Sequence, residues 1–220
     1  METPAEITLE MIRETLYSAV ISDALDGLGA PVQSPGVQLR SLTIEKFLVG
    51  RCRTTLWADM SHEDPNPYEL ELKAVDACQP DDVMIAAAGG SMRSGIWGEL
   101  LTTAATNGGC IGVVVDGAVR DVRQMTTMGF PCYALGTNVL DSMNRQRVID
   151  IDVPVEIDGV RFCPGDLIVA DVDGVVVVPQ RYEKEAIKAA WEKVHAENIT
   201  RDAIRNGMKA TEAYEKYGVL

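Results

Sequence analysis

Two short segments combine residue types that could hold a metal and an anion. The first is DGAVRD, residues 116–121, which directly follows an apolar run and ends in Arg120 and Asp121. Arginine offers a permanently charged, planar fork of donors that suits a carboxylate. Aspartate offers a hard oxygen ligand for Mg²⁺ or Mn²⁺. Taken alone, the two residues could equally be an exposed ion pair on a turn, which stabilises little.

The second segment is GIWGELLTT, residues 95–103. Gly98 stands before a helical pattern, where a glycine lets the backbone approach a ligand closely. The first turn of a helix has free N–H groups at the positive end of its dipole, so the amides of Leu100 and Leu101 could hold a carboxylate. Taken alone, this segment could also be an ordinary helix start without a ligand.

The two segments say more together. Glu99 and Asp121 each follow a glycine-containing turn near a change from strand to helix, and such turns gather at the rim of an α/β sheet. If both turns share one rim, they form a site with two carboxylates, one arginine and a pair of amides. That set suits a divalent metal that keeps most of its waters and an anionic substrate that chelates it.

The surrounding sequence predicts the elements that would position these turns. Apolar residues at helical spacing predict helices over 7–27. Strands are then expected over 51–58, 83–90, 110–117 and 130–136, separated by helices over 69–78, 98–109 and 120–129. The apolar run at 83–90 ends in two glycines and is expected to close there in a tight turn. Asp-Gly and Pro-Gly turns predict antiparallel or mixed strands over 148–179, and two helices broken at Gly207 should follow.

Composition sets the broad class. The chain has 220 residues, 46% of them hydrophobic, which fits one α/β domain over 1–220. Its net charge of −13 disfavours binding to nucleic acid or to an anionic membrane surface. The five cysteines include no CxxC pair, and no apolar stretch approaches the length of a membrane span. The acidic, amphipathic first residues are unlike a signal peptide, so we expect a cytoplasmic protein.

These motifs also carry a family resemblance. The stretch GGSMRSGIWGELLTTAATNGGCIGVVVDGAVRD resembles the signature of the RraA-like family, which joins class II pyruvate aldolases with the regulator of ribonuclease activity A. Those aldolases act on 4-hydroxy-4-methyl-2-oxoglutarate and 4-carboxy-4-hydroxy-2-oxoadipate. YSAVISDALDGLG, VPVEIDGVRFCPGDLIVADVDGVVVVP and YEKYGVL extend the resemblance to nearly the whole chain, with GELL and DGxVRD as its most specific elements.

The resemblance implies a swivelling β/α/β-type fold with C-terminal helices, assembled as a homotrimer or a dimer of trimers with sites between subunits. It implies that Asp121 binds the divalent metal, Mg²⁺ or Mn²⁺, and that Arg120 contacts the substrate. It gives Glu99 the place of an acid that acts on the waters of the metal. Residues 98–101 match the backbone stretch that holds the pyruvate part. Glu197 is the best match to a C-terminal glutamate that reaches the neighbouring site.

The resulting hypothesis is a metal-dependent lyase that cleaves a small 2-oxo acid, either by aldol cleavage or by decarboxylation of oxaloacetate. Negative charge would develop on an enolate oxygen, where the metal and Arg120 stabilise it. Aldol cleavage also needs a base for the C4 hydroxyl, for which water polarised near Glu99 is the candidate. Decarboxylation needs no such base, because CO₂ leaves.

Other readings remain open at this point. The runner-up is a regulator that binds a ribonuclease or another protein without catalysis, and the intact Glu99, Arg120 and Asp121 favour the enzyme over it. A methyltransferase finds no support, because the chain has no G-x-G-x-x-G loop. Further arginines could read the far end of the substrate, although each could equally be solvated or paired: Arg53, Arg93 and Arg145.

Overall fold

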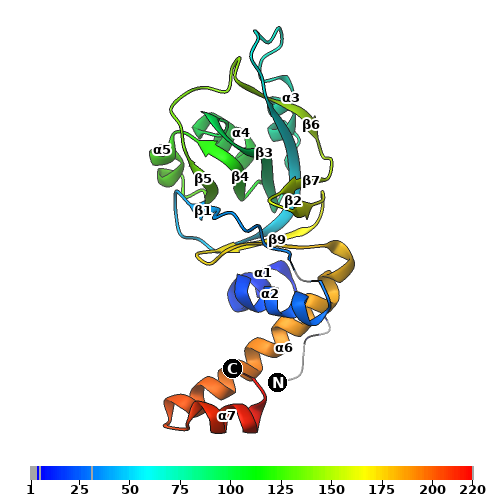
Figure 1. The fold of residues 1–220 in the computed structure, drawn as a ribbon, viewed down its shortest axis with the longest axis vertical. Coiled ribbons are helices and arrows are strands. Elements are labelled where there is room, and N and C mark those ends of the chain that lie inside the picture. The colour runs from blue at the N-terminus through cyan, green and yellow to red at the C-terminus, as the bar shows by residue number, and fades with distance from the viewer. Residues whose placement is uncertain (1–3, 5, 31, 220) are drawn as a thin grey trace.

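A computed structural model describes residues 4, 6–30 and 32–219. Its centre is an eight-stranded, barrel-like sheet with the strand order β1-β5-β4-β3-β2-β9-β10, in which β6 also pairs with β2 (Figure 1). The strands of this sheet are β1 (Arg40–Ser41), β2 (Leu48–Asp59), β3 (Asp82–Gly95), β4 (Gly112–Val119), β5 (Cys132–Thr137), β6 (Gln146–Ile151), β9 (Leu167–Asp171) and β10 (Gly174–Val178). A separate hairpin joins β7 (Val155–Ile157) and β8 (Val160–Phe162).

The parallel part of the sheet, β2 to β5, is what positions the site. Every residue of β4 is buried, as expected for a central parallel strand. Three helices pack against this part through one apolar cluster: α3 (Glu69–Asp76), α4 (Glu99–Asn107) and α5 (Val122–Thr127). The carboxyl ends of β3 and β4 meet at one edge, so the segments at 95–103 and 116–121 come together there.

The sequence predicts that the strand β3 ends at Gly89 and Gly90. This prediction is wrong, because the strand continues to Gly95. Gly89 and Gly90 adopt positive φ angles of 61° and 75°, which glycine tolerates without a steric cost. They bulge out of the ladder while the buried carboxylate of Asp116 accepts a hydrogen bond of 3.1 Å from the Gly90 amide. Pairing with β4 then resumes at Ser91, so the glycines mark a bulge rather than an end.

A helical layer covers the other side of the sheet. Two N-terminal helices, α1 (Leu9–Thr15) and α2 (Ser18–Gly27), pack with α6 (Gln180–Arg205) against β9 and β10. Beyond α6, the short α7 (Ala210–Tyr217) folds back at the far end of the molecule (Figure 1). The predicted mixed strands after residue 148 and the helix break near Gly207 are confirmed. In the portion described, no helix is long and apolar enough to cross a membrane.

Candidate functional site

The two motif turns are joined backbone to backbone at the carboxyl edge of the sheet. Ile96 donates a hydrogen bond of 3.0 Å to the carbonyl of Ala118, and Arg120 donates one of 2.8 Å to the carbonyl of Trp97. The turns border a pocket of about 270 Å³. Its lining includes Gly98, Leu100, Leu101, Arg120 and Asp121 from the predicted site, together with Tyr68, Glu71, Leu72, Gly95, Ile96, Trp97, Asp141 and Ser142.

Gly98 is required by the closeness of the two turns. A Cβ atom at this position would lie 2.5 Å from Oδ2 of Asp121 and 3.1 Å from Cγ of Arg120. Both distances are shorter than ordinary van der Waals contact, so a side chain here would displace the Arg120–Asp121 pair. The glycine thus serves close approach rather than a left-handed conformation, since its φ of −159° is extended.

Asp121 adopts the left-handed region, with φ 55° and ψ 30°, which aspartate enters more readily than most non-glycine residues. The side chain stands at the start of α5 but makes no capping bond to it. Its Oδ2 accepts a bond of 3.2 Å from the Glu99 amide, and 41% of the side chain is exposed, which leaves carboxylate lone pairs available to the pocket.

The amides of Leu100 and Leu101 lie in the first turn of α4, where no preceding carbonyl can accept from them. No hydrogen bond from either amide is found within the described ranges. The side chain of Leu100 projects outward and is 77% exposed. Of the set predicted from sequence, Leu100, Leu101, Arg120 and Asp121 line one pocket, and Glu99 does not.

The carboxylate of Glu99 points elsewhere. Its Oε1 accepts a bond of 3.1 Å from the Thr103 hydroxyl one turn along α4. Glu99 lines a neighbouring surface pocket with Arg123 and Gln124, rather than the pocket that contains Arg120. Within this chain, its backbone amide meets Asp121 while its carboxylate does not line the same cavity, so its catalytic role stays a prediction.

Sequence reasoning missed an acidic network behind Arg120. A guanidinium nitrogen of Arg120 lies 2.5 Å from Oδ2 of Asp141, and the Tyr68 hydroxyl donates a bond of 2.7 Å to Oδ1 of the same residue. Burial pushes the pKa of Asp141 up, but the bonds from Tyr68 and the Met143 amide and the charge of Arg120 lower it below its usual value. Burial, with the bond to Asp141, raises the pKa of Tyr68 to about 12. Asp141 is therefore a fixed anion that orients Arg120.

Glu71 of α3 is the second residue that was missed. It is only 8% exposed and lines the pocket. Burial is the main cause that raises its pKa to about 8, the charge of Asp141 raises it further, and Arg120 opposes both. One signal was available in the sequence. Glu71 shares a helical face with the buried Ala74 and Val75, and an acid on an apolar stripe is unusual.

The donor set can be tested against a divalent metal. In the part of the chain that the structure covers, no group of three or more His, Cys, Asp or Glu side chains converges. A metal caged by protein ligands alone does not fit these residues. A Mg²⁺-like ion does fit, because such ions keep several waters and use one or two carboxylates with the substrate. Asp121 supplies the accessible carboxylate.

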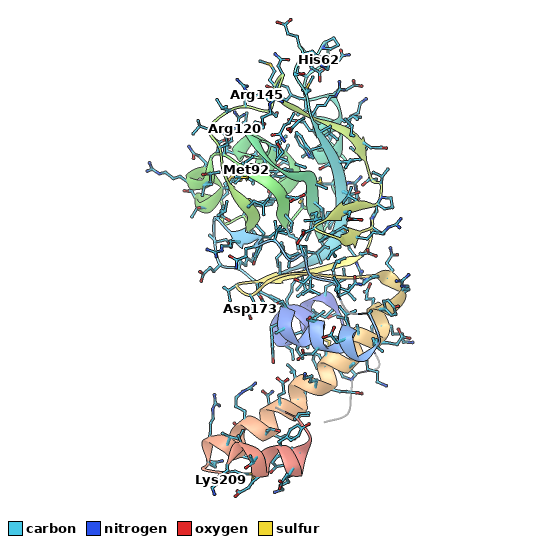
Figure 2. The ribbon with its side chains drawn as sticks, in the orientation of Figure 1. His62, Met92, Arg120, Arg145, Asp173 and Lys209 are labelled. Atoms are coloured by element: carbon cyan, nitrogen blue, oxygen red, sulfur yellow. The ribbon has the colours of Figure 1, made fainter. Side chains whose placement is uncertain are left out.

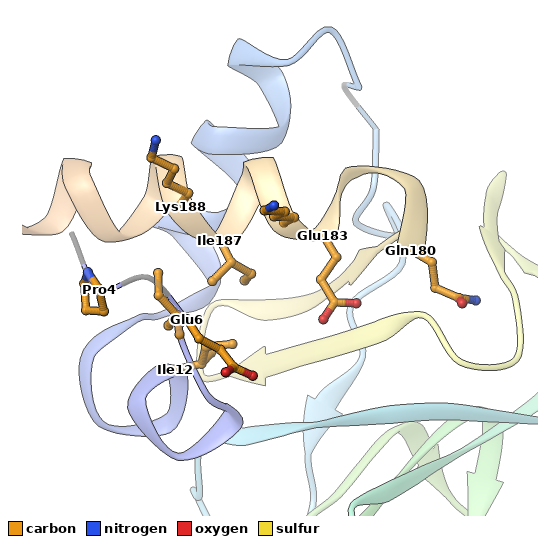
Figure 3. Close-up of a pocket in the computed structure, with 9 residues that line it drawn as sticks. Pro4, Glu6, Ile12, Gln180, Glu183, Ile187 and Lys188 are labelled. Atoms are coloured by element: carbon orange, nitrogen blue, oxygen red, sulfur yellow. The ribbon is translucent and has the colours of Figure 1, made fainter.

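The pocket beside the N-terminal segment lacks this chemistry. Figure 3 shows a pocket of about 400 Å³ between the N-terminal segment and α6, where Glu183 reaches toward the cavity. That glutamate is already paired with Arg51 at 2.6 Å. Arg120 lies in the upper part of the molecule as drawn, far from Lys209, the residue before α7 (Figure 2). Glu197, also on α6, accepts a bond of 2.6 Å from the Tyr17 hydroxyl and does not line the Arg120 pocket of its own chain.

The three other candidate arginines lie in different surroundings, outside the Arg120 pocket. Arg53 pairs with Asp82 at 3.3 Å and Asp152 at 2.8 Å, on the amino side of β3. Arg145 donates to the backbone carbonyls of Asp141 and Met143. None of the three, including the exposed Arg93, lines the pocket of Arg120.

A family model described as RraA-like, Aldolase/RraA, matches residues 18–177, which include the whole pocket. This chain belongs to the RraA-like family. A relative from Halalkalibacterium halodurans, provisionally named a 4-hydroxy-4-methyl-2-oxoglutarate aldolase, is 33% identical over 210 residues, covering 96% of this chain and 95% of that protein. The family resemblance and the mixed α/β fold predicted from sequence are confirmed.

Two solved structures have the same fold. An uncharacterised protein from Pseudomonas syringae superposes with a TM-score of 0.80 at 29% identity, covering 93% of this chain and 95% of that one. RraAS2 from Streptomyces coelicolor, described as an unusual member of the RNase ES inhibitor RraA protein family, gives 0.78 at 29% identity, covering 91% and 98%. Aldolases and ribonuclease inhibitors are thus both among the names that the relatives of this chain carry.

Proposed function

We propose that this RraA-like chain is a divalent-metal-dependent carbon–carbon lyase, an aldolase or oxaloacetate decarboxylase that releases pyruvate from a small 2-oxo acid. The observation that carries the proposal is the convergence of Arg120, Asp121 and the free amides after Gly98 on one pocket. A protein that only binds a protein partner does not require the close approach of Gly98 to the accessible carboxylate of Asp121.

Each residue has a role that its chemistry permits. The amides of Leu100 and Leu101 bind the substrate carboxylate at the positive end of α4. Arg120 donates to the C2 oxygen as negative charge develops there, and Asp141 with Tyr68 holds its guanidinium in place. Asp121 would hold Mg²⁺ or Mn²⁺, which supplies Lewis-acid stabilisation when bound.

The assembly belongs to the same proposal. Two of the apolar residues that line the pocket are exposed, Leu100 at 77% and Leu72 at 48%. Exposed apolar clusters mark interfaces. We expect a homotrimer or a dimer of trimers in which these side chains meet a neighbouring subunit, with Glu197 as the candidate that reaches the neighbouring site.

The test is pyruvate release from oxaloacetate and from 4-hydroxy-4-methyl-2-oxoglutarate, with Mg²⁺ or Mn²⁺, with EDTA, and against a metal-only blank. Metal-dependent release from both substrates supports the lyase. Release from oxaloacetate alone narrows the proposal to a decarboxylase or to another aldol substrate. No release above the blank contradicts it and favours the second candidate.

That second candidate is an RraA-type regulator that binds a ribonuclease or another protein without catalysis. It is favoured by the similarity to the Streptomyces coelicolor protein. A regulator should tolerate loss of the Asp121 carboxylate, because partner binding makes no use of a metal ligand. An enzyme should not.

A further inference from the structure

Glu71 stands apart from the other buried acids of the molecule. Asp82, Asp116 and Asp166 are also buried, and the carboxylate of each accepts at least one backbone hydrogen bond. The carboxyl group of Glu71 accepts none from any residue that the structure describes, although Glu71 is only 8% exposed. Among the described residues, the fully buried side-chain atoms without a partner are Arg53 Nε and Gln146 Nε2, so the carboxyl group of Glu71 is not sealed in the core but open to the pocket that it lines.

Glu71 faces the charged groups of the site. It lines the same pocket as Arg120 and Asp121, and the titratable groups around it come from three elements. Arg120 follows β4, Asp141 lies between β5 and β6, and Tyr68 precedes α3. Arg120 already forms an ion pair with Asp141 at 2.5 Å, so its charge is not available to Glu71 alone.

This environment keeps the proton on Glu71 near neutral pH. Burial and the charge of Asp141 together outweigh Arg120 and raise the pKa of Glu71 to about 8. Tyr68 does not compete as a donor, because its hydroxyl is committed to Asp141. A carboxylic acid near its transition point is what efficient general acid catalysis requires.

We propose that Glu71 is the acid that delivers a proton to C3 of the three-carbon fragment in this pocket. The proposal rests on the lyase function above and adds a residue to it. In aldol cleavage the C3–C4 bond breaks, and its electron pair forms the C2=C3 double bond of the enolate. The Glu71 O–H bond then breaks, and the enolate electrons form the new C3–H bond as the C2 carbonyl returns.

The proton count closes in both reactions. Aldol cleavage releases one proton from the C4 hydroxyl and uses one at C3. Decarboxylation of oxaloacetate uses one proton at C3, which comes from solvent overall. In each case Glu71 ends as a carboxylate and regains its proton from water before the next turnover.

The test is exchange of the pyruvate methyl protons in D₂O with Mg²⁺, followed by NMR, because exchange isolates the step at C3. Glu71→Gln keeps the size and neutrality of the protonated acid but has no proton to transfer. We expect its exchange rate to fall by at least about 100-fold, the usual span of general acid–base catalysis. Glu69→Gln, on the same helix and paired with Lys73, should exchange like the wild type.

Two further readouts separate proton transfer from a structural role. Wild-type exchange should rise as pH rises past the pKa of Glu71, because only the carboxylate can take the first methyl proton from pyruvate, and the residual rate of Glu71→Gln should lose that dependence. In metal-free protein at neutral pH, infrared spectroscopy should detect a protonated carboxyl band that Glu71→Gln lacks. Its absence from the wild type would overturn the proposal.

The outcomes distinguish the two proposals. If the wild type exchanges and Glu71→Gln exchanges equally fast, Glu71 is not the acid and the lyase stands. If the wild type neither exchanges nor releases pyruvate with any metal, both the lyase and the proton delivery fall.

Discussion

Arginines and acidic residues lie at both ends of the parallel strands, but the two ends differ in how completely these charges are paired. Where β3 begins, Arg53 lies between Asp82 and Asp152, and Arg51 grips Glu183 with two bonds of 2.6 and 2.8 Å. These charges have partners in their own chain. Where the strands end, the pocket holds one arginine and three acids, of which one is buried without a hydrogen bond and one is accessible: Arg120, with Asp121, Asp141 and Glu71.

This difference in pairing distinguishes a structural region from a candidate binding site. Ion pairs of this kind hold their charges within the chain, although Nε of Arg53 has no hydrogen-bond partner among the described residues. An unbalanced group of acids around one arginine is unfavourable in the isolated chain, and it is relieved by a cation or a proton. The amino end is therefore structural, and the carboxyl end has the charge imbalance that the proposed metal binding and proton transfer require.

Replacing arginine by lysine at each end of the strands should give the largest difference in activity between the two regions. Arg120→Lys loses the planar fork, so we expect pyruvate release to fall by about 100- to 1000-fold, the usual loss for one charge-stabilising donor. Its melting temperature should change little. Arg53→Lys should keep activity and lose about 1–3 kcal/mol of unfolding free energy. Equal activity in the two variants would contradict the division.

Adding one methyl group tests the close approach of the turns. Gly98→Ala places a Cβ 2.5 Å from Oδ2 of Asp121, so the aspartate must shift. Misplacement of that order should lower activity about 10- to 100-fold. Gly27→Ala is the matched control, because its Cβ meets nothing within 4 Å, and it should be neutral or slightly stabilising. Full activity in Gly98→Ala would show that the contact is unimportant.

A smaller effect should appear in stability against pH. The pKa of Glu71 is about 8 in the folded chain, above its ordinary value of 4.5, so the folded state binds more protons between those values. The free energy of unfolding therefore falls as pH rises through that window, by up to about 4 kcal/mol. Glu71→Gln should flatten this slope. Denaturant titrations from pH 5 to 9 measure it, and an unchanged slope would contradict the assignment.

The motifs predicted the part of the site that is local in sequence. GELL and DGAVRD contain their own geometry, because a glycine, a helix start and a strand end fix where Arg120 and Asp121 point. The position of Gly89 and Gly90 was misread, since the same two residues can close a turn or form a bulge. The carboxylate of Asp116 decides between them, and that contact crosses from one strand to another.

The rest of the site depends on contacts that no short pattern contains. Asp141 lies 20 residues after Asp121, in a connection without a recognisable motif, and only the sheet order brings it to Arg120. The sequence also could not predict which pocket the Glu99 carboxylate would line, because a hydrogen bond from Thr103 orients that carboxylate along α4. Glu71 was the exception, since its place on an apolar helical face was visible in the sequence.

The most direct test of the central claim is the rate of pyruvate release from oxaloacetate with Mg²⁺, measured for the wild type, Asp121→Ala and Asp26→Ala. Asp26 is an exposed acid on α2, so its removal changes the net charge equally and touches no pocket residue. The account predicts that Asp121→Ala falls to the metal-only blank while Asp26→Ala matches the wild type. Release by Asp121→Ala at the wild-type rate would contradict it.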